Sequence, residues 1–194
     1  MPPPFLPHWR ILDRRELFRT PRIAIFSETV ELPDGRIVDD YDQFEMESFA
    51  LILAQTADGE VICERQYKHG LRQVTLTLPG GHIEAGEDPL VAAKRELLEE
   101  TGYDCPDWTE IGTFRTHCNQ GGATVHYFHA TGAVKVQPEA SGDLEEIVIE
   151  LQPVLQLLDS IRRGEFLVIA DLAIVMMALL SSSLKEVALT VTGK

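Results

Sequence analysis

The sequence lacks the features that mark disulfide-bonded, membrane-spanning and nucleic-acid-binding proteins. Its 194 residues include 3 cysteines, Cys63, Cys105 and Cys118, whose odd number and wide spacing form neither a CxxC metal motif nor a disulfide framework. Basic residues are scarce as well, with 17 Lys and Arg against 31 Asp and Glu, for a formal net charge of −14. This balance argues against bulk binding to nucleic acid or to an anionic membrane. We therefore expect a protein of the reducing cytosol that binds neither nucleic acid nor an anionic membrane.

Long apolar runs are also almost absent. One extends from Phe166 to Leu180 and contains Asp171, and it is shorter than the roughly 20 apolar residues that span a bilayer. We expect a buried helix there. The opening segment MPPPFLPHWR has no basic region followed by an apolar core, so we expect no signal peptide. With 44% hydrophobic and 25% charged residues, the composition is ordinary for a globular chain with one sizeable core.

Short apolar patterns and turn residues divide the chain into strands, one central helix, more strands and two closing helices. Asp58-Gly59 lies between two strand-like runs and predicts a hairpin. Pro33-Asp34-Gly35 predicts a turn in the first section. We expect a strand-rich section at residues 10–46, strands at 49–55, 60–68, 73–78, 110–115, 123–131 and 145–151, and helices at 153–163 and 170–184. This order predicts an α/β or α+β layered domain.

The central helix has clear start and stop signals. Asp88 can cap its N-terminus, Pro89 suits its first position, and Gly102 suits the left-handed residue that ends a helix. The residues at helical spacing that predict its buried stripe are Leu90, Ala93 and Leu97.

Three carboxylates lie on another face of this helix. Glu96, Glu99 and Glu100 fall within an arc of about 100°, and a like-charge pair four residues apart destabilises a helix by roughly 0.2–0.5 kcal/mol. Arg95 can offset part of this by pairing with Glu99. A divalent cation would make the arrangement favourable, because hard oxygen ligands suit Mg²⁺ or Mn²⁺. The alternative is a solvated acidic face.

The spacing of the charged residues and glycines carries a specific resemblance. The pattern G-x5-E-x7-R-E-U-x-E-E-x-G-U of the Nudix box is matched at every fixed letter, by Gly81, Glu87, Arg95, Glu96, Glu99, Glu100 and Gly102. Leu97 fills the first aliphatic position, and Tyr103 stands where a second aliphatic residue is usual. The chain therefore resembles a Nudix hydrolase. The resemblance implies a Nudix-type α/β/α sandwich around a mixed sheet, with a small N-terminal strand-rich section.

The resemblance also implies roles for site residues. Metal ligands would be Glu96, Glu99, Glu100 and the backbone carbonyl of Gly80, binding Mg²⁺ with Mn²⁺ as a substitute. Arg95 and Glu87 would shape the site by ion pairing. In related enzymes the general base is a glutamate on a loop beyond the box. The acidic residues of that loop are, in order of preference, Glu146, Glu145 and Asp143, and the alternative is an acidic surface turn.

A second stretch resembles the ADP-ribose and nucleotide-sugar pyrophosphatases. It comprises residues 64–70, ERQYKHG, followed by LPGG at 78–81. This resemblance implies that residues 1–45 form a dimer or part of the substrate pocket, and that residues 46–194 form the Nudix domain. It implies a homodimer that hydrolyses a nucleoside diphosphate linked to a sugar into a nucleoside monophosphate and a sugar phosphate.

The substrate stays open at this point. ADP-ribose pyrophosphatases usually have a proline about sixteen residues after the second box glycine, where this chain has Cys118, beside the glycine pair Gly121-Gly122. That difference argues against strict ADP-ribose specificity. The glycine pair predicts a hairpin turn, and the alternative is a backbone loop close to phosphate or sugar. The alternatives are a Nudix hydrolase of nucleoside triphosphates or dinucleotide cofactors, and a Nudix-fold ligand sensor without turnover.

Overall fold

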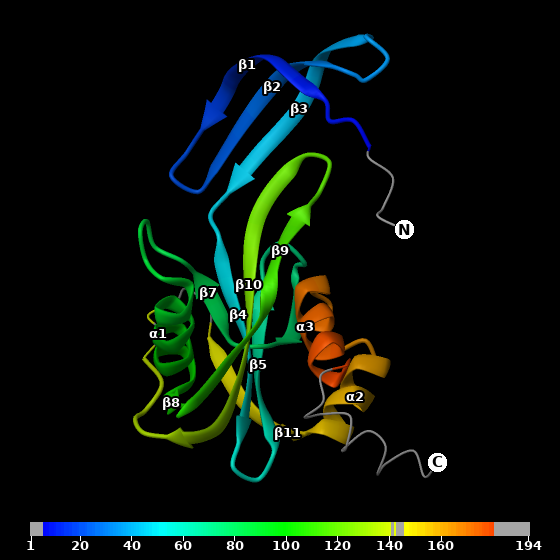
Figure 1. Cartoon of the computed structure of the whole chain (residues 1–194). Coiled ribbons are helices and arrows are strands. Elements are labelled where there is room, and N and C mark those ends of the chain that lie inside the picture. The colour runs from blue at the N-terminus through cyan, green and yellow to red at the C-terminus, as the bar shows by residue number, and fades with distance from the viewer. Residues whose placement is uncertain (1–5, 141, 143–145, 181–194) are drawn as a thin grey trace, which may run out of the picture. The chain divides into compact units, whose positions relative to one another are not determined.

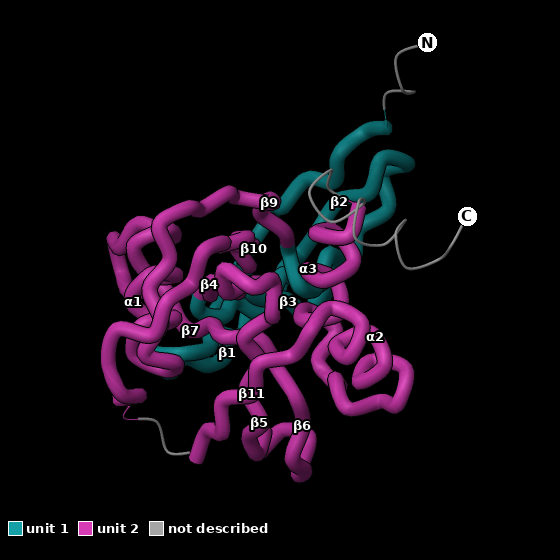
Figure 2. The backbone as a smooth tube through the Cα atoms, turned by 90° about the horizontal axis from the view of Figure 1, so that it is seen from below, with its two compact units in different colours: residues 1–47, 115–124 teal, residues 48–114, 125–194 magenta. Residues whose placement is uncertain are grey.

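The structure, a computed structural model, describes residues 6–140, 142 and 146–180. The chain forms two compact units, coloured separately in Figure 2. Unit 1 consists of residues 1–47 and 115–124, and unit 2 consists of residues 48–114 and 125–194. Each unit is described by itself.

Eleven strands and three helices are present in the described part of the chain (Figure 1). The strands are β1 (Arg10–Arg19), β2 (Ile23–Glu31), β3 (Ile37–Met46), β4 (Phe49–Thr56), β5 (Glu60–Lys68), β6 (Gln73–Thr77), β7 (Gly80–His82), β8 (Tyr103–Asp104), β9 (Asp107–His117), β10 (Gly121–Lys135) and β11 (Ile147–Pro153). The helices are α1 (Pro89–Thr101), α2 (Val154–Arg162) and α3 (Ile169–Leu180).

Unit 1 is an antiparallel meander of β1, β2 and β3. Strand β2 alternates between buried and half-buried residues, the period of two that a strand imposes on its side chains. The predicted turn at residues 33–35 joins β2 to β3, and Gly35 adopts a φ of 83° there. The start of β10 pairs in parallel with β3, with Gly121 opposite Phe44. The strand-rich first section is therefore confirmed, and the tip of the β9–β10 hairpin belongs to it.

Unit 2 is built on a mixed sheet. Strand β4 pairs in parallel with β10 and in antiparallel fashion with β5 and β7. Strand β5 pairs with β6 and β11, also antiparallel. The predicted hairpin at residues 58–59 joins β4 to β5. Both the hairpin and the mixed sheet predicted from the sequence are confirmed.

Helices cover both faces of the unit 2 sheet, with α1 on one side and α2 and α3 on the other (Figure 1). Strand β4 shows why, because its residues are buried on both faces. Leu51 and Leu53 belong to the core cluster that contains α2 and α3, whereas the alternate residue Ile52 packs in the cluster that contains Ala93 and Leu97 of α1. The predicted α/β/α sandwich is confirmed.

Some element boundaries differ from the sequence prediction. Strands β9 and β10 are longer than predicted at both ends. At the turn, Gly121 and Gly122, with φ values of 96° and 80°, continue the ladder directly after residues 118–120. The glycine pair thus belongs to a hairpin, as expected. The predicted end of the last helix at residue 184 lies outside the described residues. Within the described part of the chain, none of the helices is long and apolar enough to cross a membrane.

Candidate functional site

Helix α1 presents the candidate site, and its ends are fixed as the sequence predicts. Asp88 Oδ1 accepts hydrogen bonds from the backbone N–H groups of Leu90 (2.9 Å) and Val91 (3.2 Å). Pro89 occupies the first turn, where its missing N–H has no cost. Gly102 ends the helix with a φ of 72° and donates its N–H to the Leu98 carbonyl (2.9 Å). The carboxylates between these caps therefore lie on a rigid helix.

The segment that leads into the helix is held by two buried carboxyl groups. Asp171 of α3 is 2% exposed and accepts the N–H of Leu78 (2.8 Å). Burial raises the pKa of Asp171 to about 7. Two residues further on, Gly80 donates its N–H to Glu100 Oε2 (2.9 Å). The chain between β6 and β7 is thus attached to both α3 and α1.

Gly81 permits the close approach of this segment to α1. A Cβ atom at this position would lie 2.3 Å from the carboxylate carbon of Glu96 and 2.5 Å from both carboxylate oxygens. Any side chain here would therefore displace Glu96. The first glycine of the box is explained by this contact.

The half-buried part of the site is organised by Arg95. Its guanidinium binds both Glu87 oxygens (3.0 and 3.1 Å), Glu96 Oε1 (2.8 Å), Glu99 Oε2 (3.3 Å) and the carbonyl of His82 (3.1 Å). Arg95 holds the pKa of the Glu87 carboxyl below its usual range, with help from a backbone N–H. The predicted pairing of Arg95 with Glu99 is confirmed. This cluster, Arg95 with Glu87, Glu96 and Glu99, is called the Arg95 cluster below.

The buried part of the site is a pair of carboxyl groups. Glu100 is 6% exposed and Glu64 of β5 is 0% exposed, and the Glu64 carboxyl lies near enough for its charge to act on Glu100. Burial first, and then the charge of Glu64, raise the pKa of Glu100 well above its usual range. Gln66 Nε2 donates to Glu64 Oε2 and to Thr77 Oγ1, both at 2.9 Å. We call Glu64 and Glu100 the buried pair.

Most of the residues predicted for the site are brought together, namely Gly80, Arg95, Glu96, Glu99 and Glu100. Glu146 is exposed and directly precedes β11. The other predicted loop acids, Glu145 and Asp143, lie outside the described residues. Sequence reasoning did not assign Glu64. The available signal was Glu64 directly after the apolar run Val61–Cys63 of β5, since buried charges require a specific partner.

The donors of the site suit a divalent cation. The buried pair and the Arg95 cluster carry five glutamates against one arginine, and carboxylate oxygens are hard ligands. With the side chains as they stand, no three His, Cys, Asp or Glu groups converge as a closed metal cage in the described residues. One reason is that Arg95 occupies oxygens of Glu96 and Glu99. The residues fit a metal in chemistry and charge, once Arg95 releases these oxygens.

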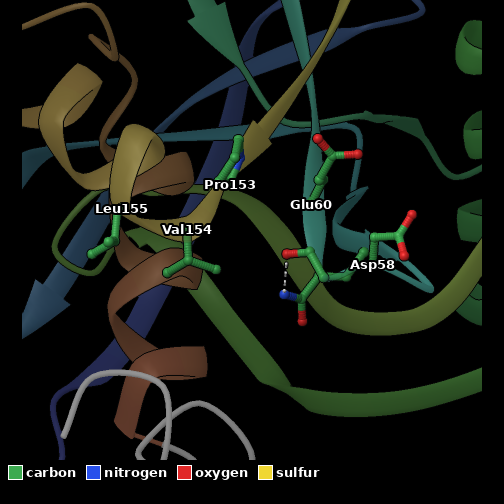
Figure 3. A pocket seen from close by; sticks show the side chains of 7 residues that line it. Asp58, Glu60, Pro153, Val154 and Leu155 are labelled. Atoms are coloured by element: carbon green, nitrogen blue, oxygen red, sulfur yellow. Dashed lines mark hydrogen bonds between the residues drawn. The ribbon is translucent and has the colours of Figure 1, made fainter. Parts of the chain in front are cut away.

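Two surface cavities in unit 2 lie away from these carboxylates. A groove of about 560 Å³ lies where the β4–β5 hairpin meets the β11–α2 junction, and Gln55, Asp58, Glu60, Val154 and Leu155 line it (Figure 3). A second cavity of about 370 Å³ lies at the N-terminal end of α1. Its lining includes Asp88, Trp108, Thr113, His126 and Phe128. None of the carboxylates of the Arg95 cluster or the buried pair lines either cavity.

Comparison with known proteins agrees with this geometry. Residues 46–172 match the NUDIX domain model. An ADP-ribose pyrophosphatase of Bacillus subtilis (strain 168) is 29% identical over 155 residues, covering 78% of this chain and 83% of that protein. A methanol dehydrogenase activator of Bacillus methanolicus is 28% identical over 139 residues, covering 72% and 75%. A crystal structure of an ADP compounds hydrolase superposes with a TM-score of 0.77 over 90% of this chain and 94% of that chain, at 20% identity.

The chain therefore belongs to the Nudix family, as its box predicts. It is a Nudix hydrolase with relatives among the ADP-ribose pyrophosphatases. Enzymes of this family generally use divalent metal ions.

Proposed function

We propose that this enzyme hydrolyses the pyrophosphate bond of a nucleoside diphosphate linked to a sugar, giving a nucleoside monophosphate and a sugar phosphate. The observation that carries the proposal is the convergence of Glu96, Glu99 and Glu100 of α1 with the Gly80 segment. Mg²⁺ is the proposed cofactor, with Mn²⁺ able to replace it. When bound, the cation supplies positive charge to the pyrophosphate oxygens in the transition state.

The residues around the cation have distinct proposed roles. Glu96, Glu99, Glu100 and the Gly80 carbonyl hold it. Arg95 releases Glu96 and Glu99 to the cation and keeps its two-point contact with Glu87, which anchors the loop before α1. The fixed caps of α1 keep these groups in place, so little reorganisation is needed when substrate binds.

A base is needed to remove a proton from the attacking water. We propose Glu146, with Glu145 as the second candidate. Glu146 is exposed and directly precedes β11, which pairs with β5 beside Glu64. An exposed carboxylate on a loop at the sheet edge can accept a proton from water without disturbing the ligands on α1.

The substrate class is tested by comparing kcat/KM for ADP-ribose, a second nucleotide sugar and ATP in the presence of Mg²⁺. We expect both nucleotide sugars to be cleaved, because relatives include pyrophosphatases of ADP-ribose and of ADP-sugars and Cys118 replaces the usual proline. ATP should be poorer, since it leaves the sugar side of the site empty and loses that binding energy. Preference for ATP would favour a triphosphatase. Absence of turnover with all three would favour a ligand sensor, a role that the activator relative makes worth testing.

A homodimer is also proposed, formed through unit 1. All ten residues of β1 are exposed, and the apolar ones among them include Ile11, Leu12, Leu17 and Phe18. In the described residues β1 pairs only with β2, so its other edge is open to a second copy. Sedimentation of the wild type and of Leu17→Asp tests this, and a monomeric wild type would refute it. The three free thiols fit a reducing cytosol.

A further inference from the structure

Three hydrogen bonds hold the segment that leads from β6 to the candidate metal site. Leu78 donates its N–H to Asp171 Oδ1 of α3 at 2.8 Å. The carbonyl of Pro79 accepts the N–H of Ile52 in β4 at 2.9 Å. The third bond joins the N–H of Gly80 to a proposed metal ligand on α1. Among these partners, Asp171 therefore provides the one side chain that is not itself a proposed ligand.

Asp171 reaches Leu78 because the chain before α3 runs beside β6. Leu76 donates its N–H to the carbonyl of Glu165 (2.8 Å) and forms a parallel bridge with Phe166. A parallel ladder would continue with a bond from the N–H of Leu78 to a further backbone carbonyl. The chain instead turns into α3, and the Asp171 carboxylate accepts this N–H. The carboxylate thus takes the place of a strand partner.

The bond lies inside the protein, and little freedom remains between it and the Gly80 carbonyl. Asp171 and Leu78 are each 2% exposed. Pro79 has a fixed φ and restricts Leu78 to extended conformations. A Cβ atom at Gly80 would lie 2.3 Å from the carbonyl oxygen of Ala50 in β4, which leaves Gly80 little room to adjust independently. A displacement of Leu78 would therefore be transmitted to the Gly80 carbonyl.

We infer that Asp171 is a positioning residue that holds the backbone of residues 78–80, so that the Gly80 carbonyl is in place for the divalent cation. This inference rests on the proposed metal site. Asp171 acts through its hydrogen bond to Leu78 and belongs to a helix on the sheet face opposite α1 (Figure 1). Groups that orient metal ligands from outside the coordination shell typically change metal affinity by about 10- to 100-fold when they are removed.

The test measures the Kd for Mn²⁺ by electron paramagnetic resonance of the free ion, without substrate. Asp171→Ala removes the acceptor of the Leu78 N–H, whereas Asp171→Asn keeps an oxygen that can accept it. We expect Asp171→Ala to weaken Mn²⁺ binding by roughly 10- to 100-fold, and Asp171→Asn by less than about threefold.

Val175→Ala is the matched control. Val175 is 2% exposed and lies one turn further along α3, so its truncation weakens the packing of the same helix while the Asp171 bond stays in place. We expect both alanine variants to lower the melting temperature, and only Asp171→Ala to change the Kd. If Val175→Ala weakens Mn²⁺ binding equally, a general loosening of α3 explains the effect and the positioning role is wrong.

The remaining outcomes also decide the inference. If Asp171→Asn weakens binding as much as Asp171→Ala, the charge matters rather than the hydrogen bond, and the inference is wrong. An unchanged Kd in Asp171→Ala would likewise overturn it. If the circular dichroism of Asp171→Ala shows no fold, hydrogen exchange of the Leu78 amide in the metal-free wild type replaces it. We expect slow exchange there, and exchange as fast as that of an exposed amide would overturn the inference. Absence of Mn²⁺ binding in the wild type would instead overturn the proposed metal site.

Discussion

The carboxylates around α1 lie in two settings that differ in how their charge is balanced. In the Arg95 cluster, one guanidinium contacts three half-buried glutamates. In the buried pair, Glu100 lies near the Glu64 carboxyl group. The Gly80 N–H donates to Glu100, and the Gln66 amide donates to Glu64. The pKa values follow this difference, because that of Glu87 is lowered by Arg95 and that of Glu100 is raised by burial and by Glu64.

The difference shows where a cation contributes most. The half-buried ion pairs of the Arg95 cluster are partly screened by water, which reduces what their charges contribute. Like charges in a buried setting repel strongly, since the effective dielectric constant is low. A divalent cation beside Glu100 would therefore relieve an unfavourable arrangement, whereas at the Arg95 cluster it would exchange one favourable pairing for another. The predictions below test this contrast.

The largest expected effect concerns a group outside both settings. The carboxylates of each setting are already held by hydrogen bonds, so the proton of the attacking water should go elsewhere. Glu146→Gln, or failing that Glu145→Gln, should lower kcat by roughly 10²- to 10⁴-fold with little change in Mn²⁺ affinity. Steady-state kinetics with ADP-ribose and a Mn²⁺ titration measure both quantities. Losses below about threefold in both variants would place the base elsewhere.

The next effect removes one member of the buried pair. Glu100→Gln should lower kcat by at least about 10²-fold, because a metal site supplies several kcal/mol to the transition state. The metal-free variant should also melt at a higher temperature than the wild type, because the repulsion with Glu64 is gone. Glu99→Gln should lose activity similarly without this gain in stability. Near wild-type turnover by both variants would refute the assigned metal ligands.

The sequence predicted the Arg95 cluster but not the buried pair. The box fixes the spacing of its residues along a single helix, and a helix converts spacing into geometry directly. Glu64 meets Glu100 only through the pairing of β5 with its neighbours, and such long-range contacts are not contained in local spacing. Helix α1 and the strands could be predicted from the sequence for the same reason, because apolar periodicity is a local property of the chain.

Unit 1 illustrates the same limit at the level of the fold. The strands at residues 10–46 were predicted from their turns and apolar alternation. The attachment of residues 115–124 to them depends on Gly121 pairing with Phe44 of β3. These residues are far apart in sequence, so the pattern of either segment alone could not show the contact.

A smaller effect is expected from crowding the Arg95 cluster. Gly81→Ala places a methyl group where the Glu96 carboxylate lies, at 2.3 Å from its carbon. The displaced Glu96 should weaken activity by roughly 10- to 100-fold while Glu100 keeps its bond to Gly80. Gly70→Ala is the control, because nothing lies within 4 Å of its added Cβ. Equal kcat/KM values for the two variants would show that Glu96 tolerates displacement.

The smallest effect is a change in the pH dependence of stability in the metal-free protein. The raised pKa of Glu100 means that the folded state holds its proton more tightly, so stability should fall as pH rises above the ordinary carboxyl pKa. The lowered pKa of Glu87 has the opposite sign, and its contribution is present above the ordinary pKa and is lost as pH falls through the folded value.

Melting temperatures in EDTA between about pH 4 and pH 7 should therefore decline less with rising pH in Glu100→Gln than in the wild type. Glu87→Gln should instead flatten the acid side. About 1 kcal/mol moves the melting temperature of a chain this size by roughly 2–4 °C, so these changes of melting temperature with pH are measurable. If the melting temperature changed equally with pH in both variants, the contrast between the buried pair and the Arg95 cluster would be wrong.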